Sequence, residues 1–181
     1  MRYTVTKDLL SEMEGLEPNK ISVISTENYN NLLNNTIPST VNENTVEVGI
    51  KLIIRSAKSN EVLVINDNKI LDIPLTVPSK EGINGYFHVI HMIDLKLREL
   101  GKLDNNIMIK THLLTLGVYY DTEINKIYHV KNIVVLDDDI QGFTEMFSDQ
   151  NTQWEKIVNI ISSPSVSKFD KIVLSTLRIV K

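Results

Sequence analysis

A helix-period stripe of apolar residues, set between strand-period segments, constrains the fold of this chain most. The stripe steps along the chain by four, three, four and three residues: Tyr86, Ile90, Ile93, Leu97 and Leu100. This spacing places the side chains on one helical face and predicts an amphipathic helix over residues 86–100. Gly101 follows directly and is a typical helix stop.

The segments before and after this helix have the two-residue period of strands. Residues 45–55 alternate apolar side chains with others and predict a strand. A polar turn over residues 56–60 and an apolar run over residues 61–65 complete a predicted hairpin. Two long β-branched runs, residues 107–116 and 127–136, predict an antiparallel pair beyond the helix.

The remaining segments predict shorter elements. Thr6 is expected to cap a short helix that reaches Met13, and residues 21–24 have the composition of a short strand. Residues 28–44 are rich in asparagine and predict a short helix followed by a loop. The C-terminal third is predicted to be helical, with Trp154 on one apolar stripe and Ser167 capping the last helix.

This order of elements predicts the fold class α+β, a mixed sheet with helices packed on its faces. A doubly wound parallel sheet would need strands and helices in strict alternation, which the chain lacks. We expect one domain over residues 45–181, preceded by an N-terminal extension, residues 1–44, packed on it.

The composition excludes several classes of protein. The absence of cysteine among the 181 residues excludes disulfides, thiolate metal sites and a cysteine nucleophile, and favours a reducing compartment. With no long apolar segment and no signal peptide, we expect a cytoplasmic protein without a membrane partner. A net charge of −4 makes a broad nucleic-acid-binding surface unexpected. A single alanine, Ala57, beside abundant isoleucine and asparagine, indicates an AT-rich genome such as that of a virus or phage.

Three short motifs lie along the Pro-Gly-rich loop and the predicted helix. Leu71-Asp72-Ile73-Pro74 leads into the loop, Lys80-Glu81-Gly82 lies within it, and Glu99-Leu100-Gly101 ends the helix. Together with the order of hairpin, loop, helix, strands and helices, they make residues 48–180 resemble the Nudix hydrolase family. The resemblance implies a Nudix-like mixed sheet sandwiched by helices. It also places the family's catalytic helix on the predicted helix that Gly101 ends.

The family signature, G-x5-E-x7-R-E-U-x-E-E-x-G-U with U a bulky aliphatic residue, is degenerate here. With Gly101 on the last glycine, the signature arginine falls on Asp94 and the next glutamate on Leu95. The paired glutamates fall on Arg98 and Glu99, so one of three helical carboxylates is kept. Mg²⁺ needs hard oxygen ligands, whereas a cation at position 98 opposes a metal and attracts phosphate. The resemblance therefore implies a retained fold without the family's chemistry.

We accordingly expect a catalytically degenerate binding or interaction module. Its ligand would be a nucleotide, a nucleotide-derived phosphate compound or another protein. The expected ligand-binding residues are Arg55, Glu81, Arg98 and Glu99, with Lys69 or Lys80 as further phosphate contacts. No catalytic residue or cofactor is assigned to such a module.

Two alternatives stay open. The first is a divergent Mg²⁺-dependent pyrophosphohydrolase that uses Glu81, Glu99 and an acid from Asp137-Asp138-Asp139. The second is a structural or assembly protein of viral or phage origin without a small-molecule site, in which strand edges would support a homodimer. Two groups have the residue types of a metal site, Asp137-Asp138-Asp139 and the set of His88, His91 and Asp94. The first is more simply explained as a solvated turn with Asp138 or Asp139 capping the next segment, and the second as polar residues on the solvated flank of the helix.

Overall fold

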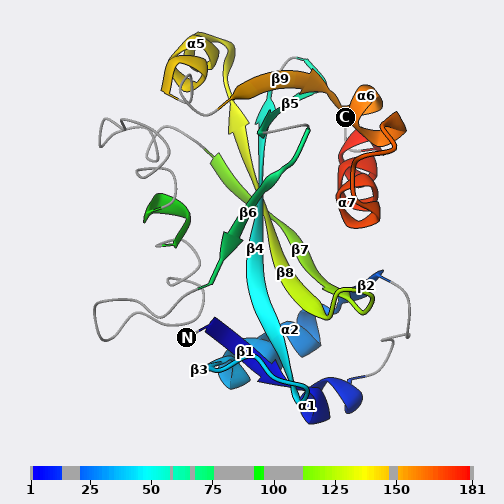
Figure 1. The fold of residues 1–181 in the computed structure, drawn as a ribbon. Coiled ribbons are helices and arrows are strands. Elements are labelled where there is room, and N and C mark those ends of the chain that lie inside the picture. Colours follow the sequence, from blue (N-terminus) through cyan, green and yellow to red (C-terminus); the bar gives the residue numbers. More distant parts are fainter. Residues whose placement is uncertain are drawn as a thin grey trace. The chain divides into compact units, whose positions relative to one another are not determined.

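The computed structural model describes residues 2–13, 21–57, 59–65, 68–75, 92–95, 112–146 and 151–179. Figure 1 shows the strands and helices, which in chain order are β1 Arg2–Thr6, α1 Lys7–Ser11, β2 Ile21–Ile24, α2 Thr26–Asn35, β3 Ile37–Ser39, β4 Thr45–Ser56, β5 Glu61–Ile65, β6 Leu71–Pro74, β7 His112–Asp121, β8 Lys126–Val135, α5 Asp137–Met146, β9 Thr152–Lys156, α6 Ile157–Ser162 and α7 Lys168–Ile179. Residues 92–95 are also helical.

Nine strands of the described residues form one sheet in the order β2-β7-β8-β4-β1-β3, with β5 and β6 also paired to β4 and β9 paired to β5. The β1–β3, β1–β4, β2–β7, β4–β5 and β5–β9 pairs are antiparallel. Contacts between β4 and β8 instead rise in step along both strands: Glu47 with Lys126, Gly49 with Tyr128, and Ala57 with Val135. These two strands therefore run parallel, and the sheet is mixed, which confirms the predicted α+β fold class.

Several predicted elements are present at nearly the predicted positions. The strand over residues 45–55 is β4, and its hairpin with β5 places Arg55 opposite Val62. The short helix after Thr6 is α1, where the Thr6 hydroxyl accepts a hydrogen bond from the Leu9 N–H at 3.3 Å. In the same way, the Ser167 hydroxyl accepts from the Asp170 N–H at 3.2 Å at the start of α7. Both N-caps satisfy backbone donors that a helix leaves open.

The chain is divided into two compact units, which we describe separately. Unit 1 consists of Met1–Lys51, Asp72–Leu95 and Thr115–Val130. Unit 2 consists of Leu52–Leu71, Lys96–Leu114 and Lys131–Lys181. Strands β4, β7 and β8 contribute residues to both units.

Unit 1 is built on the first halves of β4 and β8. Val5 of β1 and Val46 of β4 are cross-strand partners, and both are fully buried. Helix α2 packs on β8 through Tyr29 and His129, whose rings meet edge to face with centroids 5.7 Å apart. In the turn between β7 and β8, Asn125 adopts a left-handed backbone conformation, and its side chain donates to the Thr45 carbonyl at 3.4 Å. The hairpin is thereby fixed to β4.

Unit 2 contains the β4–β5–β9 ribbon and the C-terminal helices. Strand β9 pairs with β5 along its whole length, from Glu61 opposite Lys156 to Ile65 opposite Thr152. Helices α6 and α7 contribute buried apolar side chains at helical spacing: Ile157 and Ile160 from α6, and Phe169, Val173, Leu174 and Leu177 from α7. Their burial explains why these amphipathic segments are helical.

The prediction of a wholly helical C-terminal third is wrong for residues 152–156. Trp154 lies on strand β9, opposite Leu63, and is partly exposed, with its indole N–H donating to the Thr144 hydroxyl at 2.7 Å. Its spacing from Ile157 imitates a helical stripe, but strand pairing with β5 satisfies the backbone of this segment. Because α6 begins at the residue after β9, the two-residue period of the strand passes directly into the helical period of α6 in the sequence.

Other differences concern boundaries. The strand predicted over residues 107–116 is β7, His112–Asp121, and the part before residue 112 lies outside the described residues. Residues 37–39 form strand β3 on β1, although a loop was predicted there. Of the helix predicted over residues 86–100, residues 92–95 are helical, with Ile93 fully buried, and the rest lies outside the described residues.

Truncating Ile50, which is fully buried in β4, should destabilise the fold. We expect Ile50→Ala to lower the free energy of unfolding by about 3 kcal/mol, because it removes apolar burial and leaves a cavity. Val41→Ala is the control, since Val41 is 46% exposed before β4 and its truncation should cost under about 0.5 kcal/mol. Urea denaturation followed by circular dichroism measures both changes, and equal losses would contradict the assignment of β4 to the core.

Candidate functional site

Charged residues reach the surface of strand β4 at every fourth position. Glu47, Lys51 and Arg55 are its partly exposed residues, and the other nine residues of the strand are buried. Because side chains alternate along a strand, these three lie on one face. Each must meet water, an opposite charge or a ligand, because burying an unpaired charge is costly.

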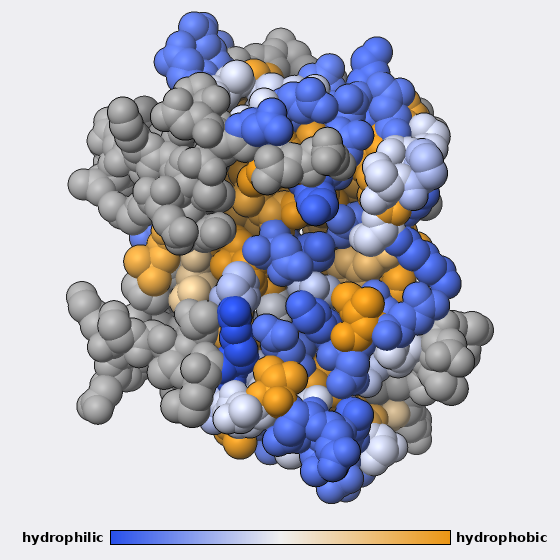
Figure 2. Space-filling view, in the orientation of Figure 1, coloured by the Kyte–Doolittle hydropathy of each residue, from blue (hydrophilic) through white to orange (hydrophobic). Residues whose placement is uncertain are grey.

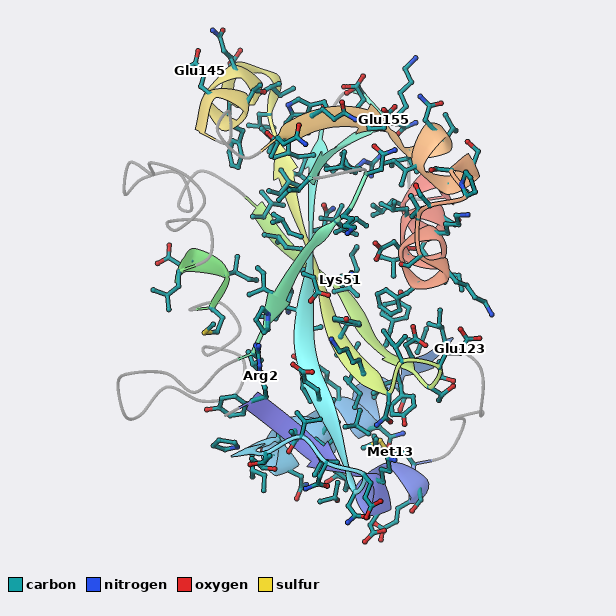
Figure 3. All side chains as sticks on the ribbon, viewed as in Figure 1. Arg2, Met13, Lys51, Glu123, Glu145 and Glu155 are labelled. Carbon is teal, nitrogen blue, oxygen red and sulfur yellow. The ribbon has the colours of Figure 1, made fainter. Side chains whose placement is uncertain are left out.

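Glu47, in unit 1, is paired with two cations. Its carboxylate lies 3.7 Å from Arg2 Nε and 3.8 Å from Lys126 Nζ. Figure 3 shows Arg2 on the neighbouring strand β1. These long, partly exposed ion pairs contribute little stability, but they balance the charge of Glu47 within the protein.

Lys51, also in unit 1, is held by an acid and an aromatic ring. Its Nζ lies 3.6 Å from Asp72 Oδ2 and 5.2 Å from the centroid of the Tyr128 ring, and the Tyr128 hydroxyl donates to the same Asp72 oxygen at 3.1 Å. The ring can approach β4 because Gly49 has no side chain: a Cβ there would lie 3.3 Å from Tyr128 Cε1. The charge of Lys51 is therefore also balanced within the protein.

Arg55, in unit 2, differs from both. Its Nη2 donates to the Asn60 side-chain oxygen at 3.0 Å, and its buried Nε has no hydrogen-bond partner. Asn60 is neutral, and no ion pair joins Arg55 to any carboxylate of the described residues. Within the part of the chain that the structure describes, Arg55 is thus the charged residue of the β4 face without a balancing charge.

A hollow of about 270 Å³ lies beside the Arg55–Asn60 contact in unit 2 and is lined by Ser59, Asn60, Glu61, Lys156, Ile157 and Val158. Its backbone frame is fixed where the Ile157 N–H donates to the Asn60 carbonyl at 2.8 Å. The hollow joins the β4–β5 turn to the junction of β9 and α6. The sequence does not predict this hollow, because the apolar spacing around residues 152–156 is that of a helix.

Lys131 is a second feature that the sequence patterns do not predict. It is fully buried in β8, within unit 2, and burial lowers the pKa of its ammonium to about 8. Desolvation disfavours the charged form of a buried lysine. The one indication of it in the sequence is a lysine inside the β-branched run of residues 127–136.

Of the predicted ligand-binding residues, Arg55 lies among the described residues as set out above. Glu81, Arg98 and Glu99 lie outside them, as do Lys80, His88 and His91. Asp94 is partly exposed within the helical residues 92–95, and Lys69 is exposed.

The Asp137-Asp138-Asp139 run does not form the turn that was predicted. Helix α5 begins at Asp137, so the three acids occupy its first turn, where carboxylates favour the positive end of the helix dipole. Within the described ranges, no group of three or more His, Cys, Asp or Glu residues is arranged to hold a metal ion. None of the described helices is long and apolar enough to cross a membrane.

Large exposed hydrophobic side chains come from many elements of the described residues: Val23, Ile37, Val41, Leu95, Ile124, Leu136, Val158 and Ile172. On the face that Figure 2 shows, hydrophilic residues interrupt the hydrophobic surface. Single exposed apolar residues are normal for folded proteins.

Comparison with known proteins identifies the fold. No protein-family model matches the sequence, and no curated protein matches it either. The structure is similar to the crystal structure of Tm1382, described as a candidate Nudix hydrolase, with a TM-score of 0.68, 12% sequence identity and 99% of each chain covered. A mutT/nudix family protein from Listeria innocua aligns with 74% of this chain and 92% of its own, at a TM-score of 0.48 and 12% identity.

The similarity to Tm1382 over nearly the whole length shows that this chain has a Nudix-like fold. The resemblance found in the sequence is therefore confirmed at the level of the fold. At 12% identity, the agreement concerns the arrangement of the backbone rather than the residues of a site.

The buried Lys131 predicts a pH-dependent stability. Below about pH 8 its amine is protonated in both the folded and the unfolded chain, whereas between about pH 8 and its ordinary pKa of 10.5 the unfolded chain binds more protons. The free energy of unfolding should therefore rise with pH in this window, by about 3 kcal/mol relative to Lys131→Met. Urea denaturation of both proteins across this range measures the difference, and a constant difference would contradict the lowered pKa.

Proposed function

We propose that this protein is a Nudix-like binding module that recognises a phosphate group of a nucleotide-derived ligand, and that Arg55 contacts that phosphate. The observation that carries the proposal is the unbalanced guanidinium of Arg55 on the β4 face. Glu47 and Lys51 on the same face have partners of opposite charge, so they are less available to a ligand.

The chemistry of the guanidinium supports a phosphate as the ligand. A guanidinium offers five N–H donors in a planar fork that matches phosphate oxygens. One donor of Arg55 is used by Asn60, which also fixes the position of the group. Nε is buried, so the remaining Nη donors are the ones that a phosphate would contact. A side chain held in place in this way loses less conformational freedom when it binds an anion.

The sequence of the predicted helix supports binding rather than hydrolysis. Aligned with the Nudix signature, Arg98 replaces a metal-binding glutamate and Leu95 replaces another. Mg²⁺-assisted hydrolysis needs carboxylates to hold the metal, whereas an arginine favours the phosphate itself. We propose Glu81, Arg98 and Glu99 as further contacts to the ligand.

Arg55→Gln tests the proposal directly. Isothermal titration calorimetry with ADP-ribose, nucleoside mono-, di- and triphosphates and inorganic pyrophosphate should find ligands for the native chain. We expect the variant to bind them at least about tenfold more weakly, since a charge-assisted hydrogen bond to phosphate contributes about 1.5–3 kcal/mol. Arg55→Lys should recover part of the affinity, because lysine keeps the charge but not the fork.

Lys7→Gln is the matched control, because Lys7 is an exposed cation at the start of α1. It changes the net charge by the same amount and should leave phosphate binding unchanged. Nucleosides without phosphate should bind neither protein. Equal binding of the phosphate ligands by native chain and Arg55→Gln would contradict the role of Arg55, and absence of any nucleotide ligand would leave interaction with a protein as the remaining form of the module.

A divergent hydrolase is the second candidate, favoured by the similarity to Tm1382, which is described as a candidate Nudix hydrolase. In this case Glu99 and Glu81 would hold Mg²⁺ together with an acid from the first turn of α5. Incubation of nucleoside diphosphate derivatives with Mg²⁺ or Mn²⁺, followed by phosphate analysis, separates the two candidates. A binding module gives no turnover, whereas turnover that Glu99→Gln lowers by about a hundredfold or more would favour the hydrolase.

A further inference from the structure

The hollow in unit 2 has groups of opposite charge on its two strands. Glu61 of β5 and Lys156 of β9 are cross-strand partners, and both line the hollow. Directly opposed residues of an antiparallel pair project from the same face of the ribbon. The side chains of Glu61 and Lys156 therefore leave the ribbon on the same side, and both residues line the hollow.

Neither charge is balanced inside the described part of the chain. Glu61 and Lys156 form no ion pair with each other or with another described residue. Glu155, the nearest acid along the chain, accepts hydrogen bonds from the Lys156 backbone N–H at 3.0 Å and from the Asn159 amide at 2.7 Å. Those two donors share one oxygen of Glu155. Glu155 lies on β9, just before α6 (Figure 3).

The rest of the wall adds one oriented amide and an apolar surface. Because the Asn60 side-chain oxygen accepts from Arg55, the N–H₂ group of the same amide is left to donate to another group. Ser59 contributes a hydroxyl, and Ile157 and Val158 contribute apolar surface, with Val158 46% exposed. One donor-rich side, one carboxylate and one apolar wall therefore meet in the same hollow.

We propose that this hollow binds a small zwitterion of the amino-acid class. Its ammonium group would pair with Glu61, its carboxylate with Lys156 and the Asn60 amide, and its side chain would lie against Val158. The volume of about 270 Å³ is near the lower limit of ligand pockets, about 300 Å³, so it fits an amino acid rather than a dinucleotide. This site does not depend on phosphate binding by Arg55, which here only positions the Asn60 amide.

Ligand analogues that lack one charge test the proposal on the unmodified chain. Isothermal titration calorimetry with alanine, valine, leucine, methionine and phenylalanine should find saturable binding of at least one. For leucine, the matched analogues are isopentylamine, which lacks the carboxylate, and 4-methylpentanoate, which lacks the ammonium group. We expect each to bind about tenfold more weakly or worse, since each loses one charged contact. No binding by any of the five amino acids, or equal binding by the analogues, would overturn the proposal.

Two charge-removing variants assign the contacts. Glu61→Gln and Lys156→Gln should each weaken binding of the amino acid about tenfold, because each removes the partner of one ligand charge. Glu145→Gln in α5 and Lys171→Gln in α7 are matched controls that should bind it as the native chain does. Circular dichroism checks that all four variants are folded. If Glu61→Gln and Lys156→Gln both bind the amino acid as the native chain does, the site is overturned. Both variants should still bind the phosphate ligands as the native chain does, so failure of this site is distinguishable from failure of phosphate binding by Arg55.

Discussion

The structure depends most on how it accommodates charged side chains on a buried strand, because an unpaired buried charge is costly in free energy. Strand β4 is buried at nine of its twelve positions, and the exceptions are charged residues on one face. Glu47 and Lys51 are each balanced by residues from neighbouring strands, and Gly49 makes room for the tyrosine that holds the lysine. Arg55 lacks such a balance among the described residues. The same physical rule therefore explains why two of these charges are structural and why the third is the best candidate for ligand recognition.

Much of the fold could be predicted from local patterns. The two-residue period of β4, the polar turn before β5 and the N-caps of α1 and α7 all depend on residues close together in the sequence. Strand β9 could not be found in this way, because its five residues pair with β5, about ninety residues earlier, and continue without a break into α6. Its hydrogen bonds, rather than the apolar spacing around Trp154, decide its conformation.

The candidate sites also divide into residues that the sequence predicts and residues that only the structure brings together. Arg55 could be singled out from the sequence because the family resemblance placed a phosphate pocket near it. The Glu61–Lys156 pair could not, since its two members meet only through the register of β5 and β9. Lys131 was missed because a lysine within a β-branched run is ordinarily expected on the solvent face of a strand, and only the structure shows it buried.

The chain has a single tryptophan, and it lies on the strand that forms one wall of the hollow. Trp154 stands two residues before Lys156, is partly exposed, and is anchored to Thr144 of α5 through its indole N–H. Indole emission responds to hydration and to hydrogen bonding, so this protein carries its own optical reporter beside the hollow. Movement of the β9 edge would change the fluorescence of one defined residue, without a label and without interference from a second tryptophan.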